Sequence, residues 1–110
     1  NSTTLNIKNS SSNQVISSKT CAVLRNYMKN VVENGTGFNA QYKSQTAGKT
    51  ATAQSGIYVD GKEQLNTWFV GFYPYDNPKY SIVVMREGGK SGAGDCCPVF
   101  RTIVEKIDNM

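Results

Sequence analysis

The spacing of hydrophobic positions changes along the chain, and the first change predicts a helix. Residues 1–15 are polar, apart from a short segment over 4–7 (Thr-Leu-Asn-Ile) that has the pattern of a strand. Ser17 or Ser18 then offers an N-cap, and Gly35 offers a left-handed C-cap. Between them, apolar side chains recur at the spacing of one helix face: Leu24, Tyr27, Met28 and Val31. We therefore expect an amphipathic helix after a polar lead-in.

The middle of the chain has the spacing of strands. Residues 44–56 carry Thr and Ala at close intervals, whereas residues 67–73 and 80–86 are apolar on both faces. Strands of the second kind belong inside a sheet that is covered on both sides. Asp60-Gly61, between the first two segments, is a strong hairpin signal. The pattern predicts three antiparallel strands.

The end of the chain returns to helical spacing. Residues 88–94 are rich in glycine and predict a flexible loop, after which Asp95 is a candidate cap and Pro98 suits a first helical turn. A stripe of apolar residues follows: Val99, Phe100, Ile103, Val104 and Ile107. The whole order predicts an α+β fold over residues 1–110, a three-stranded antiparallel sheet packed with an N-terminal and a C-terminal helix. The two helices either cover one face each or share a face.

Composition adds limits to this picture. With 110 residues and 38% hydrophobic positions the core is thin, so we expect a single partial domain of a longer parent protein. The net charge of +4 is spread over scattered lysines, which argues against a nucleic-acid partner. No apolar run reaches the length of a membrane span, so any anchor is expected outside this segment.

Cysteine and histidine usage excludes two kinds of chemistry. The sequence has no histidine and three cysteines, with no Cys-x-x-Cys, so we expect no metal site, no histidine base and no cofactor. The adjacent Cys96 and Cys97 fit small residues at a helix start better than a redox pair.

One segment carries candidate chemistry, residues 47–56. Thr50 and Thr52 are two positions apart on a predicted strand, so their hydroxyls share a face and suit the two oxygens of a carboxylate. Lys49 adds positive charge, although strict alternation places it on the other face unless the strand bends at Gly48. An ordinary threonine-rich edge strand with no ligand also fits these residues.

A family resemblance favours the ligand-binding interpretation. Residues 48–54 (GKTATAQ) resemble the Gly-Lys-Thr-Gly-Thr-Ala-Gln signature of penicillin-binding proteins. The neighbouring segments are similar to that family too: residues 16–37, 68–74 (WFVGFYP), 80–87 and 98–100. The likeness covers residues 16–107 and is greatest for the class B, monofunctional type. It implies part of the transpeptidase fold that these proteins share with serine β-lactamases.

The resemblance also implies an activity and site residues. The family's domain is a serine D,D-transpeptidase that cross-links peptidoglycan stem peptides and is acylated by β-lactams. Lys49 matches the active-site lysine, and Thr50 and Thr52 match the residues that bind the substrate carboxylate. The N–H of Thr52 matches half of the oxyanion hole, which gives Thr52 a catalytic role beside Lys49.

Two departures from the family pattern stand out. Ala51 replaces the usual glycine, which puts substrate preference in doubt. No serine has a lysine three positions later, and Ser11-Ser12-Asn13 is a chance match to the Ser-x-Asn element in a low-complexity loop. We expect the nucleophile to lie upstream in the parent, and this chain alone to be inactive.

Two other functions fit part of this pattern. One is a β-lactamase or β-lactam sensor, which shares the fold, and the other is a non-catalytic module that binds carboxylates or the cell wall. For a transpeptidase, the resemblance implies a bacterial parent anchored in the membrane, with this domain on the extracytoplasmic face. Residues 80–86 have the pattern of a central strand that lacks one partner, which leaves an open sheet edge. Either residues 1–8, with the short strand over 4–7, fold back on this edge, or two chains pair edge to edge, and we favour self-association.

Overall fold

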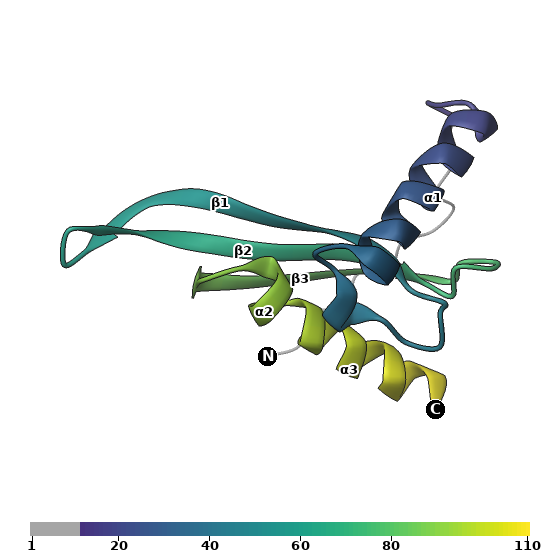
Figure 1. Ribbon diagram of the computed structural model, residues 1–110. Coiled ribbons are helices and arrows are strands. Elements are labelled where there is room, and N and C mark those ends of the chain that lie inside the picture. The colour runs from purple at the N-terminus through teal and green to yellow at the C-terminus, as the bar shows by residue number, and fades with distance from the viewer. Residues whose placement is uncertain (1–11) are drawn as a thin grey trace, which may run out of the picture.

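A computed structural model describes residues 12–110 and confirms the predicted α+β architecture (Figure 1). Along the chain, three antiparallel strands follow an N-terminal helix and precede a C-terminal one. The elements, in chain order, are α1 (Ser18–Asn34), the 3-10 turn η1 (Phe38–Ala40), β1 (Ala47–Val59), β2 (Lys62–Tyr73), β3 (Tyr80–Gly89), α2 (Gly92–Asp95) and α3 (Cys97–Asp108). The strand predicted over residues 4–7 lies outside the described residues.

Helix α1 begins as predicted and ends differently. The Ser17 hydroxyl accepts a hydrogen bond from the N–H of Thr20 at 3.1 Å, as an N-cap does. The expected left-handed C-cap at Gly35 is wrong, because this residue has φ −126° and is extended. The N–H groups of Gly35 and Gly37 both donate to the carbonyl of Val31, so the chain leaves the helix without a left-handed residue.

The face that α1 buries agrees only in part with the prediction, since Met28 and Val31 are half-buried. Leu24 and Tyr27 are 46% and 63% exposed, whereas Val32 is fully buried. The cause is the position of the helix, since only its C-terminal part lies against the start of β1 (Figure 1). Its N-terminal half points away from the sheet and leaves most of its apolar side chains uncovered.

The sheet has the order β1-β2-β3, and the hairpin between β1 and β2 closes at the predicted turn. Asp60 and Gly61 have φ +53° and +77°, so both central residues are left-handed, as a type I′ turn requires. A bulge between Gln54 and Tyr58 interrupts the register, and Gly56 has φ +76° there. The end of this hairpin projects beyond the helices (Figure 1).

The core lies between α3 and one face of the sheet. The rings of Phe69 on β2 and Phe100 on α3 are 4.7 Å apart in an edge-to-face arrangement. Gly71 permits this approach, because a Cβ there would lie 2.8 Å from the Phe100 ring. The buried cluster contains Val32, Ala40, Phe69, Tyr73, Cys96, Cys97, Phe100 and Val104. Of the predicted stripe on α3, Val99 is 46% exposed and does not belong to this core.

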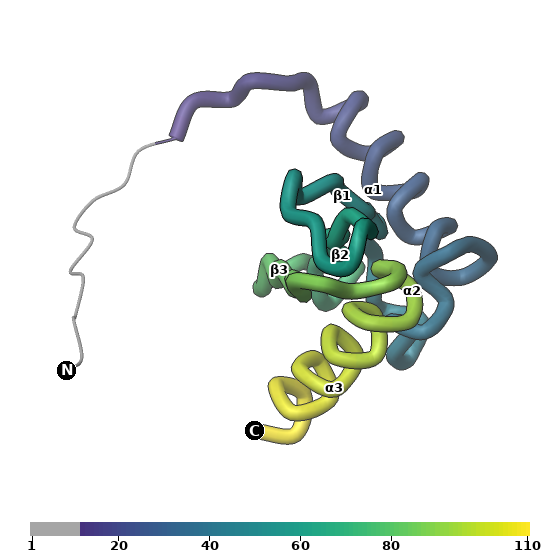
Figure 2. The backbone as a smooth tube through the Cα atoms, turned by 90° about the vertical axis from the view of Figure 1, so that its left-hand side faces the viewer, coloured from purple at the N-terminus to yellow at the C-terminus, as the bar shows by residue number. Residues whose placement is uncertain are grey.

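The other face of the sheet is mostly uncovered within residues 12–110. Val70, Val83 and Met85 are 41%, 58% and 43% exposed. Only one end of this face meets a helix, where the guanidinium of Arg25 lies 5.9 Å from the centre of the Phe72 ring. Figure 2 shows α2 and α3 together on one side of the strands. The expected cover on both faces is therefore absent from the described part of the chain, although the strands have the composition for it.

A polar cluster fastens the end of α3 to the loop before β1. The Asp108 carboxylate accepts hydrogen bonds from the Tyr73 hydroxyl, from the Tyr42 hydroxyl at 3.1 Å and from the Lys43 ammonium at 2.7 Å. The bonds from Lys43 and Tyr73 lower the pKa of Asp108 to about 2. The bond to Asp108, together with burial, raises the pKa of Tyr73 to about 12.

The glycine-rich segment is more ordered than the sequence predicts. Gly88 and Gly89 end β3, and Gly92 begins the short helix α2. The expected cap role of Asp95 on the last helix is wrong, because α3 has no side-chain cap and Ser91 caps α2 through the N–H of Gly94. Pro98 occupies the first turn of α3, as predicted.

Candidate functional site

The candidate site residues lie on β1 at an edge of the sheet. Lys49, Thr50 and Thr52 are opposite Val70, Phe69 and Thr67 of β2, in a register without interruption from Ala47 to Gln54. Within residues 12–110, β1 pairs with β2 alone, so its other edge is open. Lys49 and Thr52 are exposed and Thr50 is half-buried, which leaves all three accessible to a ligand.

Thr50 and Thr52 share one face, as their spacing predicts. Strand alternation places both on the face of Phe69 and Thr67, toward α2 and α3. The Thr50 hydroxyl is 2.9 Å from the hydroxyl of Thr36, in the turn that follows α1. The site therefore has a third hydroxyl that the analysis of the strand alone did not include. Its signal in the sequence is a threonine between Gly35 and Gly37 directly after a helix.

Lys49 lies on the opposite face, and its side chain turns back toward the threonines. Its ammonium donates a hydrogen bond to the carbonyl of Thr50 at 3.0 Å. This bond brings the ammonium to the backbone of Thr50 rather than to its hydroxyl, and the register of β1 runs through Gly48 without interruption. Glycine is required at position 48 for packing, because a Cβ there would lie 2.3 Å from the Phe69 ring.

Ala51 lies on the same face as Lys49, opposite Trp68. The residue is exposed, so its methyl group meets open space rather than a neighbouring element. Because this face is turned away from the hydroxyls of Thr50 and Thr52, the methyl leaves the paired hydroxyls unobstructed.

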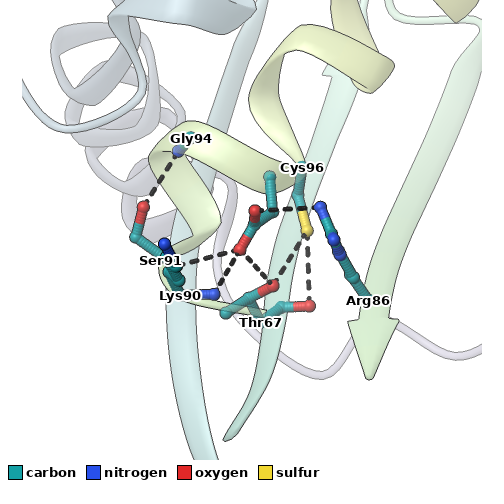
Figure 3. A network of polar contacts seen from close by, with 7 residues as sticks. Thr67, Arg86, Lys90, Ser91, Gly94 and Cys96 are labelled. Atoms are coloured by element: carbon teal, nitrogen blue, oxygen red, sulfur yellow. Dashed lines mark hydrogen bonds and ion pairs between the residues drawn. The ribbon is translucent and has the colours of Figure 1, made fainter. Parts of the chain in front are cut away.

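An anchored turn lies behind this strand (Figure 3). One oxygen of the Asp95 carboxylate accepts from the N–H groups of Lys90 and Ser91, at 2.6 and 2.9 Å, and from the Thr67 hydroxyl at 3.3 Å. The other oxygen forms an ion pair with Arg86 at 3.2 Å. The bonds from Ser91 and Lys90, with the charge of Arg86, lower the pKa of Asp95. Asp95 is thus ionised at neutral pH and fixes the start of α2.

The two adjacent cysteines have structural positions. Cys96 and Cys97 are both fully buried and both are free thiols. The Cys96 thiol donates to the carbonyl of Thr67 at 3.3 Å, and burial raises the pKa of Cys97 to about 11. A buried thiol with a raised pKa is a poor nucleophile, which agrees with a packing role at the start of α3.

Residues 12–110 contain neither a metal site nor a membrane-spanning helix. Among residues 12–110, no group of cysteine and acidic side chains is placed to hold a metal ion. No helix in the same range is long and apolar enough to cross a membrane.

Comparisons with known proteins agree on one family. The family model described as the penicillin binding protein transpeptidase domain matches residues 6–105. The chain is 35% identical over 111 residues to the peptidoglycan D,D-transpeptidase FtsI of Buchnera aphidicola, covering 93% of this chain and 19% of that protein. It is 36% identical over 81 residues to the stage V sporulation protein D of Bacillus subtilis, covering 70% of this chain and 12% of that protein.

Solved structures give the same result. The D,D-transpeptidase domain of a peptidoglycan glycosyltransferase from Eggerthella lenta aligns with a TM-score of 0.71 and 27% identity, over 86% of this chain and 21% of that one. Penicillin-binding protein 2B of Streptococcus pneumoniae aligns with a TM-score of 0.61 and 26% identity, over 86% of this chain and 16% of that one. The chain thus spans about a fifth or less of the proteins it matches, and it belongs to the penicillin-binding protein transpeptidase family.

Proposed function

We propose that β1 is the substrate-binding strand of a serine D,D-transpeptidase that cross-links peptidoglycan, and that a longer parent protein supplies the nucleophile. The observation that carries this proposal is the arrangement of Lys49, Thr50 and Thr52 on the open edge strand of a chain that belongs to this family. An open strand edge beside two hydroxyls and an ammonium suits an extended peptide that ends in a carboxylate.

Each residue has a separate task in this proposal. The hydroxyls of Thr50 and Thr52 donate to the two oxygens of the terminal carboxylate of a stem peptide, or to the carboxylate of a β-lactam. Lys49 supplies positive potential beside the reacting carbonyl. The N–H of Thr52 donates to the oxygen of that carbonyl as negative charge develops, and such preorganised donors lower the barrier of acyl transfer.

The partners and the location follow from the substrate. The stem peptide is part of the cell wall, so the parent works on the extracytoplasmic face of the bacterial membrane, anchored by a segment outside this sequence. The similar proteins FtsI of Buchnera aphidicola and MrdA of Haemophilus influenzae are peptidoglycan D,D-transpeptidases, which favours this activity over a β-lactamase, a β-lactam sensor or a binding module.

The test is acylation of the parent protein by a fluorescent penicillin. Lys49→Ala should slow acylation about a hundredfold, because loss of one preorganised electrostatic contact costs on the order of 3 kcal/mol. Lys62→Ala is the matched control, since Lys62 is also exposed but lies at the far end of the hairpin. If Lys49→Ala is acylated within about twofold of the rate of the unchanged parent, far from the hundredfold loss expected, Lys49 does not belong to the site.

A further inference from the structure

Helix α2 packs directly on the candidate substrate-binding strand. Its first residue, Gly92, is buried, and a Cβ there would lie 2.5 Å from the carbonyl oxygen of Trp68. The same Cβ would be 3.2 Å from the Cβ of Thr50 and 3.2 Å from the carbonyl oxygen of Ala51. The backbone of α2 therefore lies against the residue whose hydroxyl faces the ligand, with no side chain between them.

The Asp95 carboxylate holds α2 in this place. It binds the two N–H groups that lead into the helix, those of Lys90 and Ser91. It also accepts from the hydroxyl of Thr67, which is fully buried and is the cross-strand partner of Thr52. One carboxylate thus connects Lys90 and Ser91, which lead into α2, with Thr67 on β2 (Figure 3).

We propose that Asp95 is a positioning residue that sets how strongly Thr50 and Thr52 bind the ligand's carboxylate. This inference rests on the proposed function. Paired hydroxyls discriminate in favour of a carboxylate only while both are held at hydrogen-bonding distance from its two oxygens. Removal of the Asp95 carboxylate frees the chain at Lys90 and Ser91, and α2 then no longer confines Thr50. Thr67 loses its acceptor at the same time, beside Thr52.

The experiment measures acylation of the full-length parent by one penicillin and by its methyl ester, which lacks the carboxylate charge. The readout is the ratio of the two acylation rates. In Asp95→Ala the rate for the penicillin, divided by the rate for its ester, should fall about tenfold or more. Misplacing a binding group by about 1 Å can cost roughly a hundredfold in rate, so a loss of this size is expected. A role limited to overall stability lowers both rates together and leaves the ratio unchanged.

Three further variants sharpen the result. Asp95→Asn should keep most of the ratio, because its amide oxygen still accepts from Lys90 and Ser91. Arg86→Gln is the control, because Arg86 binds only the outward oxygen of Asp95 and its side chain is 62% exposed. Thr67→Val conserves shape and removes only the hydroxyl, so it lowers the ratio even if Asp95→Ala does not fold.

The outcomes are distinct. In a double-mutant cycle, Asp95→Ala should lower the ratio no further once Thr50 and Thr52 are both valine, because coupled residues are not additive. If the ratio is unchanged in Asp95→Ala, because the two rates fall equally or not at all, the positioning role is overturned and the proposed function stands. If Asp95→Ala does not fold, an unchanged ratio in Thr67→Val has the same meaning. Absence of any Lys49-dependent acylation in the unchanged parent would overturn the proposed function, and this inference with it.

Discussion

The hydroxyl of Thr36 lies 2.9 Å from that of Thr50, so the two share a hydrogen bond. Either hydroxyl can be the donor of this bond. A carboxylate that accepts from Thr50 leaves Thr36 to donate to Thr50 in turn, and such chains of hydroxyls strengthen one another. In the proposed function Thr36 would therefore support Thr50, from outside the strand motif.

Thr36→Val in the parent should weaken acylation by a carboxylate-bearing penicillin less than Thr50→Val does. The expected loss is about threefold to tenfold, because a neutral hydrogen bond contributes about 0.5–1.5 kcal/mol. Thr20→Val is the control, since Thr20 is a hydroxyl in the first turn of α1, away from β1. A larger loss for Thr36→Val than for Thr50→Val would mean that Thr36 contacts the ligand directly.

The lowered pKa of Asp108 makes the free energy of unfolding depend on pH at the acidic end. Its pKa is about 2 in the folded chain and near 3.8 otherwise, so its contribution is complete above pH 4 and is lost as the pH falls toward 2. Tyr73 acts in the opposite range, because a pKa raised from 10 to about 12 gives stability that is lost as the pH rises through that interval.

Urea unfolding of the chain at several pH values tests this account. Asp108→Asn should be less stable than the unchanged chain at neutral pH, and the difference should shrink below pH 4. Glu105→Gln is the matched control on the same helix, because within residues 12–110 the Glu105 side chain has no recorded ion pair. A difference that stays constant down to pH 2 would contradict the role of the carboxylate charge.

Among the elements, the β1–β2 hairpin depends on a local backbone requirement. Gly61 has φ +77°, and an added Cβ there would meet nothing within 4 Å, so a substitution is strained for conformational reasons only. Gly61→Ala should lower the free energy of unfolding by about 1–2 kcal/mol, the cost of a left-handed non-glycine residue. Asp60→Asn should be nearly neutral, because asparagine tolerates this conformation. Urea unfolding measures both, and equal stability of all three chains would refute the turn assignment.

The sequence predicts features with local causes and misses those that depend on distant contacts. The turn at Asp60-Gly61, the cap at Ser17 and Pro98 in α3 depend on neighbouring residues, and all three were predicted. The exposure of Leu24 depends on where α1 meets the sheet, and the partners of Asp95 come partly from β2 and β3. These features depend on tertiary packing, which periodicity does not contain.

The site divides in the same way. Thr50 and Thr52 on one face of an edge strand follow from a spacing of two, and the structure has this arrangement. Thr36 bonds to Thr50 on β1 from 14 positions away, and Asp95 bonds to Thr67 on the neighbouring strand β2 from 28 positions away. The spacing of residues along the chain does not show that these side chains meet the sheet, so both contacts were missed, although the Gly-Thr-Gly at residues 35–37 is a local signal for Thr36.

At the scale of the whole chain, we expect no covalent adduct with a β-lactam. No Ser-x-x-Lys is present, and in the proposed function the lysine and threonines of β1 supply binding and electrostatic stabilisation but no nucleophile. A denaturing gel after incubation with a fluorescent penicillin should show no labelled band, while the parent protein is the positive control. A stoichiometric band would reveal a nucleophile within these 110 residues.

Self-association through β3 remains a prediction about the molecule as a whole. Within residues 12–110, β3 pairs only with β2, and Val83 and Met85 on it are 58% and 43% exposed. Two chains can pair these edges about a two-fold axis. Light scattering during size-exclusion chromatography should show a concentration-dependent dimer. Val83→Lys should abolish it, whereas Val99→Lys, on exposed α3 surface, should not. A chain that stays monomeric at all concentrations would contradict this edge pairing.

The order of the strands has one further consequence. Because β2 lies between β1 and β3, the strand that carries Lys49 and the strand with the exposed valine are opposite rims of the sheet. Pairing at one rim therefore leaves the backbone groups of the other untouched. A dimer joined through β3 would be a continuous six-stranded ribbon, twice the three strands of one chain, with the unpaired edge of a β1 strand at each outer border. Assembly and ligand capture would then proceed without competing for the same hydrogen bonds.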